Sequence, residues 1–251
     1  MAQRIELFGI GIDNMTMSQS VARVSEFVAS GTAHQHVVIN VDKVVKLSKD
    51  PELVRIVQGC DMVNADGMPI VWASRLVGTP LQERVAGIDL FLNLVAHAST
   101  KAWPIYLLGA KPDVLQAVIQ HFNTKFPSLI IVGSHDGYWQ KEDELALIDT
   151  ICASGAKLLF VAISSPKKEF MLSRIQEHGS IPFAMGVGGS FDVIAGKVKR
   201  APLWMQSYGL EWFYRFLQEP RRMFRRYFID ALSFGGLLLK ELFKQRLKKL
   251  R

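Results

Sequence analysis

Asp66 is the residue of this sequence best placed to do chemistry. It follows the short expected strand 61–65 and precedes Gly67. This position predicts a carboxylate at the carboxyl end of a strand, the edge at which parallel sheets bind ligands. Such a carboxylate can take a proton from an attacking hydroxyl, as a general base does. The alternative is a helix N-cap, because Asp caps helices well and a helical stretch begins at Met68. The sequence leaves both interpretations open.

Two further polar residues are expected near the same edge. Asn40 ends the expected strand 36–40, where its amide can hydrogen-bond a polar ligand; as a single residue it is more often a turn residue. Arg84 lies in the segment Glu83-Arg84-Val85-Ala86-Gly87, before an expected helix. Its guanidinium can grip a phosphate through two hydrogen bonds. The alternative for Arg84 is an ordinary surface ion pair.

Two strand-to-helix turns carry features that suit phosphate. The segment 186–190, Gly-Val-Gly-Gly-Ser, opens a helix that Ser190 is expected to cap, and helix N-termini bind phosphate groups. It resembles a GxGxxG only loosely, because Phe191 stands where the third glycine would be. The segment 164–169 contains Lys167 and Lys168, which can meet phosphate or simply begin a solvated helix.

Several cofactor and metal motifs do not occur in the sequence. It contains no GxxxxGK[ST], no two Asp residues two positions apart, and no HExxH or comparable spacing among its six histidines. No GxGxxG follows the first expected strand, which disfavours a nicotinamide-dependent oxidoreductase. We therefore expect no required metal and no cofactor.

Apolar runs alternate with amphipathic stretches along the first 200 residues. This alternation predicts an α/β fold, a mostly parallel sheet with helices on both faces. The first helix is expected over residues 16–30. The expected strands are 6–12, 36–40, 61–65, 105–108, 129–132, 158–163 and 183–187.

The excess positive charge lies in the last fifth of the chain. Residues 201–251 hold 11 of the 30 Lys and Arg residues and 4 of the 23 Asp and Glu residues, so residues 1–200 hold 19 of each. This asymmetry predicts a neutral domain, 1–202, and a basic helical appendage, 203–251. The N-terminus lacks the apolar core of a signal peptide, and no apolar run approaches the ~20 residues of a membrane span. Two cysteines without CxxC spacing indicate reduced, buried thiols in the cytosol.

Aromatic and basic residues recur at helical spacing in the appendage. One stripe consists of Leu239, Phe243, Leu247 and Leu250, and another of Lys240, Lys244 and Lys248. A basic amphipathic helix of this kind is typical of the interface of an anionic membrane. The alternatives are a helix packed on the domain with a solvated basic face, and a nucleic-acid surface, for which the aromatic residues lie on the wrong face.

Five ordered blocks resemble the WecG/TagA/CpsF glycosyltransferase family, also called glycosyltransferase family 26. The blocks are "NADGMPIVWASRL" with "ERVAGIDLF", "FPSLIIVGSHDGYW", "AISSPKKEF" and "GVGGSFDVIAGKVKRAPLWMQSYGLEWFYRFLQEPRR". The resemblance extends from about residue 5 to residue 226. Any one block alone is a weak signal, whereas five in order are a strong one.

The resemblance implies a Rossmann-like α/β domain with a helical C-terminal appendage. It also implies a membrane-associated, metal-independent, inverting enzyme of bacterial cell-surface polysaccharide synthesis. It would move a sugar from a UDP-sugar donor to a polyprenyl-diphosphate-linked saccharide acceptor. It would work in the cytoplasm, peripheral on the inner face of the cell membrane, with an anionic membrane surface and no nucleic acid as partner. The alternative function is a nucleotide-sugar-binding membrane adaptor without activity, which would have no use for a base at Asp66.

The resemblance also implies roles for individual residues. Asp66 matches the proposed general base, Asn40 the asparagine of a T-x-N strand end, and Arg84 the arginine expected near the diphosphate. Positions expected to bind substrate are Tyr138, Lys168, Gly186, Gly188, Asp192, Arg215, Arg222 and Arg225. Two positions depart from the family pattern, because Val38 replaces a threonine and Lys168 replaces a glutamine. The departures put the donor sugar in doubt, with N-acetylmannosamine, its uronic acid and glucose as candidates.

Overall fold

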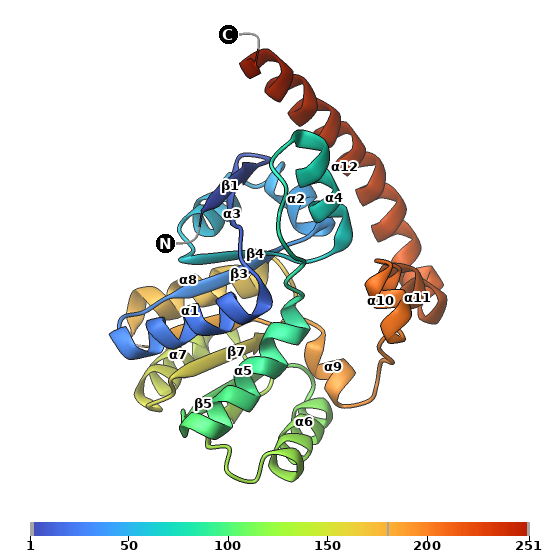
Figure 1. Ribbon diagram of the computed structural model, residues 1–251. Coiled ribbons are helices and arrows are strands. Elements are labelled where there is room, and N and C mark those ends of the chain that lie inside the picture. Colours follow the sequence, from blue (N-terminus) through green and yellow to red (C-terminus); the bar gives the residue numbers. More distant parts are fainter. Residues whose placement is uncertain (1–2, 180, 250–251) are drawn as a thin grey trace.

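A six-stranded parallel sheet forms the centre of the molecule, and helices cover both of its faces (Figure 1). This computed structural model describes residues 3–179 and 181–249; within the last helix the side chains of residues 222–223, 225–227 and 248–249 lie outside the described set. The α/β class predicted from the sequence is confirmed. In sheet order the described strands are β4 (Met62–Ala65), β3 (Gln35–Ile39), β8 (Phe183–Gly186), β7 (Leu158–Ala162), β5 (Ile105–Gly109) and β6 (Ile131–His135).

The central strands are apolar on both sides because helices cover both faces. In β5, Ile105 and Leu107 pack into one core, and Tyr106 and Leu108 pack into the core on the opposite face. The first core is closed by α1 (Met17–Ser30), α5 (Gly87–Lys101), α6 (Pro112–Lys125) and α9 (Ser190–Ile194). The opposite face is covered by α2 (Val41–Leu47), α3 (Pro51–Gln58), α7 (Glu144–Ala153) and α8 (Lys167–His178). The 3₁₀ helix η1 (Lys141–Asp143) directly precedes α7.

Two expectations for local structure were wrong. The expected strand 6–12 is a hairpin of β1 (Arg4–Leu7) and β2 (Ile10–Asp13), joined by Phe8 and Gly9, which both have positive φ. The expected strand 129–132 is β6, which continues through Gly133 to residue 135. Gly133 does not end the strand; it makes room for a ring, since a Cβ there would lie 2.4 Å from Cε2 of Tyr106.

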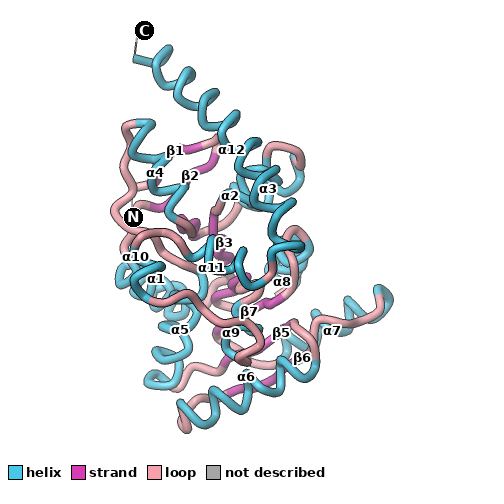
Figure 2. Tube along the Cα trace, turned by 90° about the vertical axis from the view of Figure 1, so that its right-hand side faces the viewer, coloured by secondary structure: helices cyan, strands magenta, loops and turns pink. Residues whose placement is uncertain are grey.

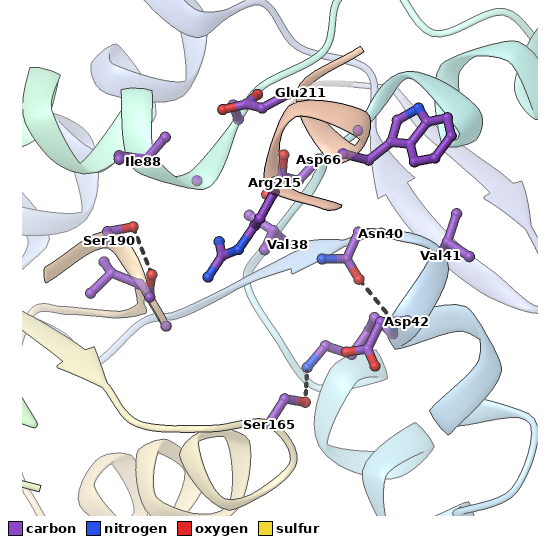
Figure 3. A pocket seen from close by; sticks show the side chains of 18 of the residues that line it. Val38, Asn40, Val41, Asp42, Asp66, Ile88, Ser165, Ser190, Glu211 and Arg215 are labelled. Atoms are coloured by element: carbon purple, nitrogen blue, oxygen red, sulfur yellow. Dashed lines mark hydrogen bonds between the residues drawn. The ribbon is translucent and has the colours of Figure 1, made fainter. Parts of the chain in front are cut away.

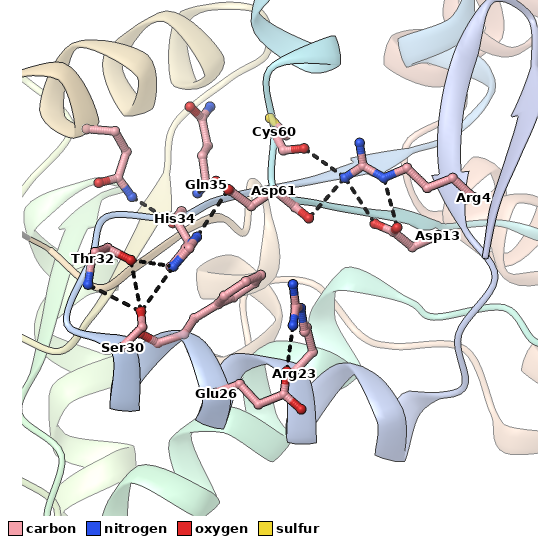
Figure 4. A network of polar contacts seen from close by, with 12 residues as sticks. Arg4, Asp13, Arg23, Glu26, Ser30, Thr32, His34, Gln35, Cys60 and Asp61 are labelled. Carbon is pink, nitrogen blue, oxygen red and sulfur yellow. Dashed lines mark hydrogen bonds and ion pairs between the residues drawn. The ribbon is translucent and has the colours of Figure 1, made fainter. Parts of the chain in front are cut away.

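A polar network fastens the hairpin to the edge of the sheet (Figure 4). Arg4 pairs with Asp13 at 2.9 Å and also donates to the carbonyls of Cys60 and Asp61, each at 2.9 Å. Asp13 in turn accepts a 2.7 Å hydrogen bond from the backbone of Val63 in β4. These bonds hold β4 in place immediately before Asp66.

Three helices follow residue 202: α10 (Leu203–Ser207), α11 (Glu211–Gln218) and α12 (Pro220–Lys249). The long helix α12 packs on α2 and on α4 (Met68–Val77), and Figure 2 shows it from the side. Phe234 is buried in the core shared with the hairpin, 5.3 Å from the ring of Phe8, and Leu237, Leu238 and Leu242 pack against the same core. One face of α12 therefore packs against the body of the protein. The division of the chain into two domains at residue 202 remains a prediction.

Candidate active site

A cavity of about 780 Å³ opens at the carboxyl ends of β4, β3, β8 and β7 (Figure 3). The polypeptide lines it from both sides of residue 202, since Arg84 and Lys168 share its wall with Glu211, Arg215 and Asp230. Of the residues that the sequence singled out, those brought together here are Asn40, Asp66, Arg84, Lys168, Gly186, Gly188, Asp192 and Arg215.

Asp66 lies directly after β4 and faces this cavity. It is not a helix cap, because α4 has Gly67 at its N-cap position and no side-chain cap hydrogen bond. Burial raises the pKa of the Asp66 carboxyl, the charge of Arg84 lowers it, the charge of Glu211 raises it, and the backbone N–H of Gly87 lowers it by hydrogen bonding. Because burial is the largest of these effects, Asp66 has the raised proton affinity that suits a general base.

Asn40 has a structural role at the same edge of the sheet. Its Oδ1 accepts a 2.9 Å hydrogen bond from the backbone N–H of Lys43 and so caps α2. Asn40 is therefore the N-cap of α2, which differs from the turn residue that the sequence offered as the alternative. Its amide nitrogen points toward the cavity in Figure 3 and can still donate to a ligand there.

Arg84 takes part in an ion pair inside the cavity wall and not on the open surface. Its Nη1 lies 3.1 Å from Oε2 of Glu211, and its side chain is 15% exposed. Glu211 also pairs with Arg200 at 3.4 Å, and Arg200 makes a bidentate pair with Asp89 at 2.6 and 2.7 Å. The segment before α10 and the start of α11 are thereby joined to the residues around Asp66.

Lys168 occupies the space that two glycines leave open. A Cβ on Gly186 would lie 3.0 Å from Cδ of Lys168, and one on Gly188 would lie 3.5 Å from its ammonium. Beside it, Lys43 and Glu169 form a buried ion pair, and Lys43 donates to Oγ of Ser165 at 2.8 Å. Burial lowers the pKa of Lys43 to about 8, against the opposing charge of Glu169. The buried ammonium of Lys43 thus lies in the wall of the cavity.

Arg215 extends from α11 into the cavity (Figure 3). Its buried Nε has no hydrogen-bond partner among the described residues, and its Nη2 would lie 3.3 Å from a Cβ on Gly189. A guanidinium placed in this way can receive an anion. The predicted roles of Arg222 and Arg225 fall on side chains outside the described residues.

Tyr138 does not line the cavity. It lies in the loop after β6, at the far edge of the sheet, and its side chain is exposed. Ser190 likewise differs from its expected role, because it is the first residue of α9 and Gly189 is the N-cap. The Ser190 hydroxyl instead donates to the carbonyl of Val187 at 2.7 Å.

Sequence reasoning missed four residues of the site: Lys43, Arg200, Glu211 and Ser165. Their partners are distant in the sequence, as in the pair of Arg84 and Glu211 and the pair of Lys43 and Glu169. The one signal available was local, since Ser165 lies in the strand-to-helix turn that was noted for its lysines.

No group of three or more His, Cys, Asp or Glu side chains in the described part of the chain is arranged to hold a metal ion. Among the described helices, none has the length and apolar character needed to span a bilayer.

The model of the family described as "Glycosyl transferase WecG/TagA/CpsF family" matches residues 5–248. The match includes the body, the cavity-lining segments and almost all of α12. The predicted resemblance is confirmed over a longer stretch than the blocks that carried it. The chain therefore belongs to the WecG/TagA/CpsF family, the glycosyltransferases of cell-surface polysaccharide synthesis, and is a transferase.

Proposed function

We propose that this transferase moves a sugar from a UDP-sugar donor to a polyprenyl-diphosphate-linked saccharide with inversion at the anomeric carbon. The observation that carries the proposal is Asp66, a carboxylate of raised pKa that faces a cavity at the carboxyl edge of the sheet. The family supports a nucleotide-sugar donor and a glycan acceptor. The cavity volume of about 780 Å³ is within the range of small-molecule sites.

In the proposed reaction, the charged groups of the cavity have separate roles. The hydroxyl oxygen of the acceptor attacks the anomeric carbon of the donor from the face opposite UDP. The bond from that carbon to the diphosphate breaks, UDP leaves with the electron pair, and Asp66 takes the hydroxyl proton. Arg84, Lys168 and Arg215, which all line the cavity, stabilise the negative charge on the leaving diphosphate.

The outer face of α12 supports a membrane partner. Its exposed apolar residues recur at intervals that place them on one side of a helix. Among the described side chains they are Phe224, Phe228, Ile229, Leu232, Leu239, Phe243 and Leu247. They lie opposite the face that Phe234 buries against the body. Lys240 and Lys244 flank this stripe, as expected for a helix in the interface of an anionic membrane. We therefore infer a cytoplasmic protein, peripheral on the inner face of the cell membrane, and keep residues 203–251 as its proposed appendage.

A panel of UDP-sugars tests the proposal. Each is measured for binding and for UDP release, with and without a short-chain lipid-diphosphate saccharide acceptor. We expect at least one donor to release UDP only when the acceptor is present. Binding of UDP-sugars without UDP release from any donor would instead identify a nucleotide-sugar-binding adaptor.

A further inference from the structure

Glu211 joins two arginines across the cavity wall. It is the first residue of α11, and its two carboxylate oxygens lie 3.1 Å from Nη1 of Arg84 and 3.4 Å from Nε of Arg200. Arg200 already has a bidentate partner in Asp89. Arg84 therefore depends on Glu211 far more than Arg200 does.

Arg84 also interacts with a second carboxylate, that of Asp66. In the described part of the chain, however, Glu211 and not Asp66 lies within ion-pair distance of Arg84. The guanidinium is thus held on the Glu211 side of the site. Without Glu211, Asp66 would be the carboxylate to which Arg84 turns, since a partly buried guanidinium needs an anionic partner.

We propose that Glu211 is a positioning residue, which holds Arg84 away from Asp66 and so keeps the Asp66 carboxylate unpaired and able to take a proton. The proposal rests on the proposed role of Asp66 as the base.

The charges around Asp66 fix the direction of the effect. Arg84 lowers the pKa of Asp66, while Glu211, on the far side of Arg84, raises it; Lys168 from α8 also lowers it. Other charged groups that line the same cavity are Asp42, Lys43 and Lys46 from α2, Asp192 from α9, Lys199 and Arg200 from the segment before α10, Arg215 from α11 and Asp230 from α12. Loss of the Glu211 charge therefore lowers the pKa of Asp66, directly and through a closer Arg84.

The test is the pH dependence of turnover on a water-soluble acceptor analogue. Glu211→Gln keeps the size of the side chain and removes its charge. We expect the acid limb of the profile to move to lower pH, and the plateau to fall roughly 3- to 10-fold because a weaker base accepts the proton less well. Glu211→Asp keeps the charge and should leave the acid limb near that of the unmodified protein.

Gln218→Ala is the matched control on the same helix. Gln218 fastens α11 to the backbone of Lys199 with hydrogen bonds of 3.1 and 3.0 Å, and it carries no charge. Its replacement should leave the acid limb in place. An equal shift in this control, or an unmoved limb and plateau in Glu211→Gln, would overturn the proposal.

Asp66→Asn separates this proposal from the one on which it rests. If that variant is inactive while Glu211→Gln has a normal profile, Asp66 is the base and only the positioning role fails. If Asp66→Asn retains turnover, the base assignment itself fails, and the positioning role fails with it.

Discussion

The backbone N–H of Gly87 lies beside the carboxylate of Asp66 and lowers the pKa of that carboxyl. Gly87 is the first residue of α5, and Asp66 directly follows β4. A Cβ on Gly87 would lie 3.7 Å from Oδ2 of Asp66 and 3.5 Å from Val38. The proposed base therefore lies beside a backbone group that a side-chain substitution at Asp66 does not remove.

Asp66→Asn should abolish transfer and preserve donor binding. The asparagine oxygen can still accept from Gly87, so the site keeps its shape, but an amide cannot take the proton of the acceptor hydroxyl. We expect turnover to fall by about 10²–10⁴-fold, and UDP-sugar affinity to change by no more than a few-fold. Kinetics with a soluble acceptor and calorimetric donor binding measure the two quantities. Asp113→Asn, at an exposed ion pair with Lys197, is the control, and near-normal turnover in Asp66→Asn would refute the assignment.

Replacing one residue of the buried pair Lys43 and Glu169 should lower the free energy of unfolding far more than replacing both. Glu169→Gln leaves a buried ammonium without its carboxylate, and breaking such a pair costs about 3–5 kcal/mol in the free energy of unfolding. The double variant Lys43→Met, Glu169→Leu removes both charges and should cost much less than the sum of the two single changes. Urea unfolding of the unmodified protein, Lys43→Met, Glu169→Leu and the double variant measures this difference, with Glu169→Gln measured beside them.

The exposed pair of Arg23 and Glu26 provides the comparison for that cycle. Its removal should change the free energy of unfolding by at most about 1 kcal/mol, because water screens both charges. A cost for Glu169→Gln as small as this would contradict the interpretation of the buried pair.

The parts of the site that could be predicted are those with a recognisable pattern in a short stretch of sequence. The strand-to-loop steps at Asn40 and Asp66 and the glycines 186 and 188 were identified, because an apolar run that ends in a polar or glycine residue is visible within ten residues. The structure brings them into one cavity because parallel strands end at the same edge. The roles assigned to them there remain predictions.

Long-range pairing could not be predicted in the same way. Nothing near Arg84 in the sequence indicates that its partner is Glu211, and nothing near Lys43 indicates Glu169. Tyr138 shows the converse, because the resemblance predicted that it binds substrate and it lies outside the cavity lining. The turn at Phe8 and Gly9 was missed because phenylalanine rarely adopts positive φ, so the hairpin looked like one continuous strand.

His36 should make stability depend on pH in the mildly acidic range. Burial lowers the pKa of its imidazole to about 4, despite the 3.0 Å hydrogen bond to Asn64. Between pH 6.5 and pH 4, His36 is therefore protonated in the unfolded chain and neutral in the folded chain. The contribution of His36 to stability therefore falls as the pH falls through this window, by about 3 kcal/mol in total, and levels off below it.

Unfolding of His36→Gln by urea at several pH values isolates this contribution. Glutamine can keep the hydrogen bond to Asn64 but does not titrate, so stability should fall less steeply between pH 6.5 and pH 4 than in the unmodified protein. His121→Gln, at an exposed position, should leave the slope unchanged. Equal slopes for the unmodified protein and His36→Gln would show that His36 does not remain neutral on folding.

The outer stripe of α12 should mediate membrane binding without contributing to the fold. Deleting residues 237–251 is a poor test, because Leu237, Leu238 and Leu242 pack against the body and their loss would expose its core. Leu239, Phe243 and Leu247 lie on the outer face and are 59%, 65% and 64% exposed. Replacing these three with serine should therefore leave the free energy of unfolding and turnover on a soluble acceptor nearly unchanged.

Flotation with anionic vesicles measures the effect on binding. We expect the triple variant to bind at least roughly tenfold more weakly, because each large apolar side chain contributes about 1.5–3 kcal/mol when fully withdrawn from water. Binding of the unmodified protein should also weaken as salt is raised, since Lys240 and Lys244 attract the anionic surface through a screened interaction. Leu145→Ser is the matched control, because Leu145 is 63% exposed on α7, away from α12. If the triple variant floats as well as this control, the outer face of α12 is not the membrane contact, and the aromatic residues of α10 and α11 become the next surface to test.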